Sequence, residues 1–228
     1  MNATWVLVVE GPSDERRLRG LLAATGQAAQ PVGLTAGRSF TAIKDVPRVA
    51  QALRLPPVHG RFDHGDERNL RQALQVVHKL QRDGALGDRV VLIWGRDTDG
   101  DLGRRQVATA IQAHQAEVGG AVLVRAVAHR CGEAWCVAGA THPQAQRARA
   151  DLRGALGFDP VLAPARLSAK PAAPRPDAKQ ALEALTDGDL DVELECLLRA
   201  WADALGSPVG EEIGLADLRR DLEALAHS

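Results

Sequence analysis

The chain has 228 residues, which is long enough for one domain with additions or for two small domains. Hydrophobic residues make up 45% and aromatic residues 3%, with no Tyr, so a core must be built from Ala, Val and Leu. The formal net charge of -1 argues against a protein that coats nucleic acid by bulk charge.

The chain shows no membrane or secretion signal. No apolar run is long enough to span a bilayer. Met1 leads into an apolar segment and Glu10 without the basic start and cleavage site of a signal peptide. The three cysteines cannot all pair and suit a reducing compartment. We therefore expect a cytoplasmic protein.

The chain begins with a predicted strand, turn and helix. Residues 5–9 form a continuous apolar run, which is typical of a strand buried on both faces. Turn-forming residues follow, and we expect Ser13 or Asp14 to cap a helix over 15–24.

The same alternation continues to residue 128. Residues 31–34 indicate a second strand, and we expect Asp66 to cap a helix with Leu70, Leu74 and Val77 on its buried face. The other elements are a short helix over 46–53, a strongly apolar strand over 89–94, a helix over 104–118 and a strand over 121–128. This order predicts an α/β fold, with a mostly parallel sheet flanked by helices.

Beyond residue 142 the pattern becomes helical. Helices are predicted over 144–156, 177–185 and 189–205, and a last one is lined by Leu215, Leu218, Leu222 and Leu225. The five prolines within 159–176 indicate an irregular connection without a regular strand, which we expect on the surface. We therefore divide the chain into an α/β domain, 1–142, and a helical extension, 143–228.

Acidic residues follow both strongly apolar strands. Glu10 comes after the first strand, and Asp97, Asp99 and Asp101 come just past the strand over 89–94. Ligands of parallel sheets bind at the carboxyl ends of the strands, so we predict that Glu10, Asp97 and Asp99 converge there. Unpaired carboxylates repel one another, and Mg²⁺ or Mn²⁺ is the natural compensation. The alternative is that the aspartates only form the loop around Gly100.

This pairing of acids resembles the Toprim domain of topoisomerases, primases and the overcoming-lysogenization-defect nucleases. In that family a Glu closes the first strand, as Glu10 does here, with Gly11 and Asp14 in the customary turn. An Asp-x-Asp closes a later strand, and Asp97-Thr98-Asp99 matches it. The resemblance implies a Rossmann-like, Toprim-type sheet.

The closer likeness is to the small stand-alone Toprim-like proteins of the DUF4276 family, which are commonly found beside ATPases in bacterial defence loci. Glu133-Ala134-Trp135 matches the Glu-x-Trp of that family, and Lys179 begins a helix after a Pro-rich stretch. Gly95 and Arg96 are a departure, because the family usually carries the strand straight into the first Asp.

The resemblance implies a divalent-metal-dependent nuclease, or nuclease subunit, that hydrolyses the phosphodiester bonds of DNA or RNA. Asp97 and Asp99 would hold the ion, Asp101 would be an outer or second-metal ligand, and Glu10 a ligand or general base. Asp14 and Glu133 are candidates for a second ion. Lys179, and Arg16 beside the Glu10 turn, are candidates for phosphate contact.

Other interpretations remain open. The rival from another class is a catalytically weak Toprim-like module that docks on a partner ATPase through its Leu-rich helices. Asp97-Thr-Asp-Gly also resembles the nucleophile motif of haloacid-dehalogenase-type phosphatases, although no later strand supplies their acidic pair, and a glycosyltransferase Asp-x-Asp is equally short. Two weaker metal hypotheses are structural zinc among His129, Cys131, Cys136 and His142, and a metal in the loop with His59, Asp63, His64 and Asp66.

Overall fold

A computed structural model describes residues 3–27, 30–60, 62, 64–118, 120–170 and 175–226. The chain divides into two compact units: the first comprises Met1–Arg96 and Leu102–Ala126, and the second comprises Asp97–Asp101 and Val127–Ser228. The predicted boundary after residue 142 differs from this division. The turn 97–101 and the segment 127–142 belong with the C-terminal helices.

The first unit is built on a parallel sheet with the strand order β2-β1-β3-β4. The strands are β1 (Thr4–Val9), β2 (Thr41–Ala42), β3 (Val90–Asp97) and β4 (Val122–Ala128). The inner strand β1 has four consecutive residues, 6–9, with no exposed surface. This burial on both faces explains its uninterrupted apolar sequence. The predicted α/β class with a parallel sheet is confirmed.

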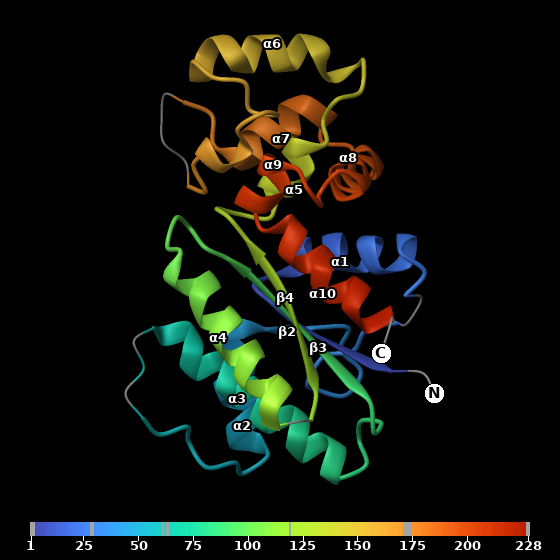
Figure 1. Ribbon diagram of the computed structural model, residues 1–228, viewed down its shortest axis with the longest axis vertical. Coiled ribbons are helices and arrows are strands. Elements are labelled where there is room, and N and C mark those ends of the chain that lie inside the picture. The colour runs from blue at the N-terminus through green and yellow to red at the C-terminus, as the bar shows by residue number, and fades with distance from the viewer. Residues whose placement is uncertain are drawn as a thin grey trace. The chain divides into compact units, whose positions relative to one another are not determined.

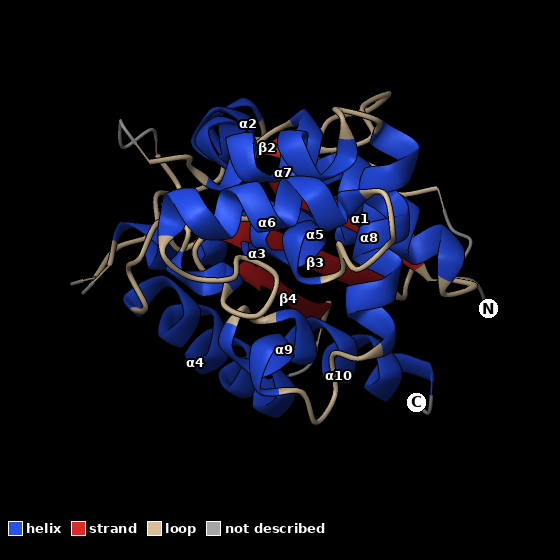
Figure 2. Ribbon diagram, turned by 90° about the horizontal axis from the view of Figure 1, so that it is seen from above, coloured by secondary structure: helices blue, strands red, loops and turns tan. Residues whose placement is uncertain are grey.

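Helices cover both faces of this sheet. Helix α1 (Pro12–Ala24) lies on one side, and α2 (Val46–Ala52), α3 (Gly65–Arg82) and α4 (Gly103–Val118) lie on the other (Figures 1 and 2). From β1 the chain goes outward to β2 and then returns to β3 on the opposite side of β1. The strand order therefore reverses between β1 and β3, which is where parallel sheets open a crevice for ligands.

Two elements of the first unit begin elsewhere than the sequence suggests. Helix α1 begins at Pro12, one turn before the predicted start at Glu15, because proline is well suited to the first helical position. Helix α3 is capped by His64 rather than by Asp66: the Asp66 N–H donates to His64 Nδ1 at 3.2 Å. The carboxylate of Asp66 is thereby available for another contact.

The predicted strand over 31–34 is wrong. Only Val32 forms an isolated bridge, to Val6, and the edge strand β2 comes later in the chain. Pro31 has no N–H to donate to a ladder. Gly33 lies so close to the returning chain that an added Cβ would be 2.5 Å from the carbonyl oxygen of Phe40. The segment thus adds a single bridge beside β1, and the turn that leads to β2 follows it at 36–37.

The second unit is helical beyond β4, as predicted. Its helices are α5 (Glu133–Ala138), α6 (Ala145–Leu156), α7 (Ala178–Thr186), α8 (Leu190–Ala202), α9 (Pro208–Glu212) and α10 (Leu215–Ala226). Helix α5 packs against α7 and α8 through its buried residues 134–137. This packing places 133–142 with the helical extension rather than with the sheet.

The Pro-rich connection holds no regular strand in its described residues, but it is not confined to the surface as predicted. Pro160, Val161 and Leu167 are buried, as is most of a short 3₁₀ helix, Pro164–Arg166. Proline has no backbone N–H group. A proline-rich segment can therefore be buried with few backbone donors left without a hydrogen bond. Residues 171–174 lie outside the described residues.

Candidate functional site

The carboxyl ends of β1 and β3 carry a charged pair in the first unit. Val8 lies opposite Trp94, and continuing this register by two residues brings Glu10 opposite Arg96. The guanidinium Nη1 of Arg96 donates to Glu10 Oε1. Gly95 permits the close packing beneath them, because an added Cβ would lie 2.7 Å from Cγ1 of Val9. The strand order reverses at this point, which is the position where parallel sheets commonly bind ligands.

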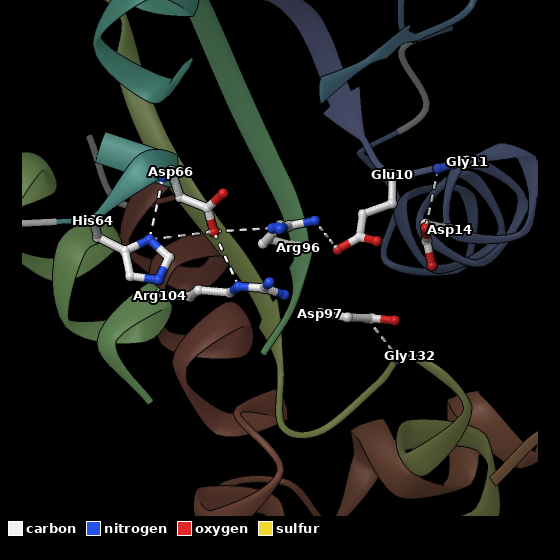
Figure 3. Close-up of polar contacts among 9 residues, drawn as sticks. All are labelled: Glu10, Gly11, Asp14, His64, Asp66, Arg96, Asp97, Arg104 and Gly132. Atoms are coloured by element: carbon white, nitrogen blue, oxygen red, sulfur yellow. Dashed lines mark hydrogen bonds and ion pairs between the residues drawn. The ribbon is translucent and has the colours of Figure 1, made fainter. Parts of the chain in front are cut away.

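Arg96 also binds a second acid, Asp66 of α3. Its Nε donates to Asp66 Oδ2 at 2.9 Å, and Arg104 Nε lies 3.3 Å from the same oxygen. Figure 3 shows the side chain of Arg96 between Glu10 and Asp66. Burial lowers the pKa of the Arg96 guanidinium, but Asp66 and Glu10 outweigh it and raise the pKa above its ordinary value. Arg96 is therefore a fixed positive charge.

The sequence interpretation missed this network. From the sequence, Arg96 is only an interruption before Asp97, and Asp66 is a helix cap or a metal candidate of the loop before α3. Strand β3 in fact continues through Gly95 and Arg96 to Asp97, so the strand does run straight into the first Asp. Arg96 moreover supplies to Glu10 the positive charge that was expected from a metal ion. Glu10 therefore does not require a cation for charge balance.

The other candidates near the start of the chain have local contacts. Asp14 Oδ2 accepts the N–H of Gly11 at 3.2 Å, and Asp14 Oδ1 lies 3.3 Å from Nη1 of the buried Arg17. These contacts stabilise the first turn of α1. Arg16 is exposed on the same helix. Their predicted roles toward an ion and a phosphate stay predictions.

In the second unit, the turn Asp97–Asp101 is held against the last residue of β4 and the segment that follows it. The N–H of Thr98 donates to Ala128 O at 2.9 Å, and the N–H of Asp99 to Arg130 O at 2.9 Å. The fully buried Thr98 places its hydroxyl 2.8 Å from His129 Nδ1. A turn with this many contacts is fixed in position, and it presents the predicted Asp-x-Asp at the carboxyl end of β3.

The acids of this turn differ in their surroundings. Asp97 is half-buried and its Oδ1 accepts the N–H of Gly132 at 2.9 Å (Figure 3). Asp99 and Asp101 are exposed, and Asp99 has a φ of 50°. Aspartate tolerates this left-handed conformation better than most residues. Asp97 is thus anchored, whereas Asp99 and Asp101 face solvent.

Glu133, the first residue of α5, lies near Asp97. The thiol of Cys131 is buried next to these two acids. Burial raises the pKa of the thiol far above its ordinary value, and the negative charges of Glu133 and Asp97 raise it further. Such a thiol stays protonated and is not a nucleophile. The structure thus gathers Asp97 and Glu133 around Cys131.

The remaining candidates are not gathered in this way. Lys179 is exposed in the first turn of α7, which is capped by Asp177. Glu10 belongs to the first unit, and the acids of the turn and Glu133 to the second. The convergence of Glu10, Asp97 and Asp99 stays a prediction.

The candidate metal ligands are carboxylates, imidazoles and thiols. The carboxylates are of the type that Mg²⁺ or Mn²⁺ prefers. However, within the described ranges no three His, Cys, Asp or Glu side chains are grouped so that they could hold an ion. This applies to the zinc hypothesis as well: Cys131 and Cys136 are buried free thiols. Of the loop candidates, Asp63 lies outside the described residues and His64 caps α3.

The sheet, its helices and the reversal at β1 and β3 define a Rossmann-like α/β protein with a network of charged residues at the carboxyl ends of β1 and β3. Comparison with protein-family models, curated proteins and solved structures found no match. Among the described helices, none combines the length and apolar composition that crossing a membrane requires.

Proposed function

We propose that this protein is a Toprim-like nuclease, or the nuclease subunit of a complex, that hydrolyses phosphodiester bonds of nucleic acid with the help of Mg²⁺ or Mn²⁺. The observation that carries the proposal is the fixed turn Asp97–Asp101, which follows β3 directly and bears the Asp-x-Asp. Backbone hydrogen bonds to Ala128 and Arg130 hold the turn, and Asp99 and Asp101 are exposed residues of it.

The residues have separate parts in this proposal. Asp97, Asp99 and Asp101, with Glu133, supply hard oxygen donors, and a bound ion would neutralise phosphate charge and activate water. In the first unit, Arg96 adds a permanent positive charge at the carboxyl ends of β1 and β3 and fixes the position of Glu10. Arg96 thus acts as a positioning residue for Glu10. The described side chains are not grouped for an ion, so none of these residues is assigned a step on a bound ion.

A cleavage assay tests the proposal. The purified chain is incubated with plasmid, single-stranded DNA and single-stranded RNA while Mg²⁺ and Mn²⁺ are titrated. We expect cleavage of at least one substrate with either ion, and its loss in Asp99→Asn. Asp187→Asn is the matched control, because Asp187 is also exposed and has a φ of 51°. Equal cleavage by both variants would show contaminating nuclease and overturn the proposal.

One observation favours the second candidate, a binding module that docks on a partner ATPase. Glu10, a carboxylate that the nuclease hypothesis assigns to the reaction, is already neutralised by Arg96. A module of this kind would bind its partner with or without divalent ions and would cleave none of the three substrates. The same titration therefore separates the two candidates.

A further inference from the structure

A hollow of about 700 Å³ lies beside the edge strand β2 in the first unit. It is lined by the loop before β2, by α2 and, through Leu80, by α3. Small-molecule sites are concave, mostly apolar, and have volumes of about 300–1,000 Å³. The hollow has the size of such a site, and the proposed function makes no use of it.

The walls of the hollow are mainly apolar. Leu34 and Phe40 contribute from the loop, Val49 and Leu53 from α2 and the residue that follows it, and Leu80 from α3. Leu34 is almost fully buried, whereas Phe40, Val49, Leu53 and Leu80 are half-buried. Their exposed parts form a concave surface that a non-polar ligand would cover.

Two arginines, Arg38 of the loop and Arg48 of α2, also line the hollow. Both are exposed, and within the described residues the guanidinium of neither has a hydrogen bond or ion pair. Asp45 is the acidic residue of the lining, so the site has an excess of one positive charge. Two such guanidinium groups favour a carboxylate or phosphate, whose oxygens match their planar fork of donors.

The loop that carries Arg38 is held in shape before any ligand binds. The N–H of Gly33 donates to Arg38 O at 2.6 Å, and the N–H of Arg38 donates to Thr35 O at 3.2 Å. The N–H of Leu34 donates to the buried hydroxyl of Thr41 at 2.7 Å. A loop fixed in this way loses little conformational entropy when a ligand binds, which favours affinity.

We propose that this hollow binds a small amphipathic anion. Its carboxylate or phosphate pairs with Arg38 and Arg48, and its non-polar body covers Phe40, Val49 and Leu80. A peptide strand added to the sheet edge fits less well, because β2 has only two residues with which to pair. The proposal is independent of the nuclease, since none of the proposed nuclease residues lines the hollow.

The test is a titration of the full chain followed by calorimetry and by amide NMR shifts. Four probes separate the contributions. Octanoate joins a carboxylate to an aliphatic chain, and AMP joins a phosphate to a ribose with an aromatic base. Inorganic phosphate supplies the anion alone, and octanol the aliphatic chain alone. We expect octanoate or AMP to shift amides within 34–53 and to bind at least about tenfold more tightly than phosphate or octanol. Whichever of the two binds more tightly identifies the body as aliphatic or aromatic.

Variants locate the site. Arg38→Gln and Arg48→Gln should each weaken binding about 10- to 100-fold, since each removes a charge-assisted hydrogen bond. Arg68→Gln is the matched control, because Arg68 is an exposed arginine of α3 that does not line the hollow. Unchanged binding in the Arg38→Gln/Arg48→Gln double variant, phosphate binding as tight as that of octanoate and AMP, or no shift within 34–53 at millimolar octanoate and AMP would each overturn the proposal.

Discussion

Arg96 holds two carboxylates from distant parts of the chain with one guanidinium group. Glu10 and Asp66 are 86 and 30 positions away from it in sequence, and Arg96 is 17% exposed. Partly buried charges of this kind are costly when one partner is removed, because the other is left without compensation. Arg96 is thus both part of the candidate site and a structural link between the end of β1, β3 and α3.

Replacing this arginine should destabilise the first unit. We expect Arg96→Met to lower the free energy of unfolding by about 2 kcal/mol, because Glu10 and Asp66 lose their shared partner. In the Glu10→Gln background the same change should cost about 1 kcal/mol less, since one of the two acids is then already neutral. Urea unfolding of the four proteins in this double-mutant cycle measures both values.

An exposed pair provides the comparison. Arg71 and Glu67 lie one turn apart on α3, and the side chain of Arg71 is 41% exposed. Arg71→Met should cost no more than about 0.5 kcal/mol, as is usual for such helix pairs. Equal losses from Arg96→Met and Arg71→Met would mean that the network around Arg96 is no stronger than an ordinary surface ion pair.

At the scale of elements, the crossing of α5 and α8 depends on one glycine. Gly139 ends α5, and an added Cβ would lie 1.8 Å from the carbonyl oxygen of Cys196 in α8. That distance is far inside any van der Waals contact, and the neighbouring atom is backbone. The two helices can therefore keep their present separation only with glycine at this position.

A pair of glycine substitutions tests the crossing. Gly139→Ala should destabilise the second unit by several kcal/mol, at least about 3, because the helices must separate or shift. Gly154→Ala in α6 should instead stabilise it by about 0.5–1 kcal/mol, because nothing lies within 4 Å of the added methyl group and alanine favours helix. Thermal melting of both variants measures the effects, and a tolerated Gly139→Ala would contradict the close crossing.

The helices and strands differ in how well the sequence predicts them. The two buried strands were predictable, because 5–9 and 90–94 are continuous apolar runs between turn residues. Strand β2 was not, since two residues carry no periodicity. The acids at the strand ends were predictable from the chain order, but Arg96 bridging Glu10 and Asp66 depends on tertiary packing. The hollow beside β2 was missed for the same reason, because its lining comes from three segments.

At the scale of the whole molecule, the turn Asp97–Asp101 is a short part of the second unit that interrupts the sequence of the first. The turn belongs to the second unit, although Arg96 before it and Leu102 after it belong to the first. Hydrogen bonds join the turn to Ala128, Arg130 and Gly132, which also belong to the second unit. An ion or substrate bound by the turn would therefore stabilise the fold of the second unit as well as take part in any reaction.

Ion binding by the turn should consequently be visible in unfolding. An ion that binds only the folded state stabilises it by roughly 2.7 kcal/mol at a hundredfold excess over its dissociation constant. For a chain of this length, that corresponds to a rise in melting temperature of about 5–10 °C. We expect such a rise with millimolar Mg²⁺ or Mn²⁺ and its loss in Asp99→Asn, which removes an exposed carboxylate.

The metal-free variant provides the decisive control. Asparagine adopts the left-handed conformation of residue 99 as readily as aspartate does, so Asp99→Asn should melt at the wild-type temperature or slightly above it. Asp187→Asn, at the same φ in the second unit, should leave the response to the ions unchanged. If Asp99→Asn instead unfolds the metal-free protein while the wild type ignores both ions, the aspartates serve the turn alone and the nuclease proposal fails.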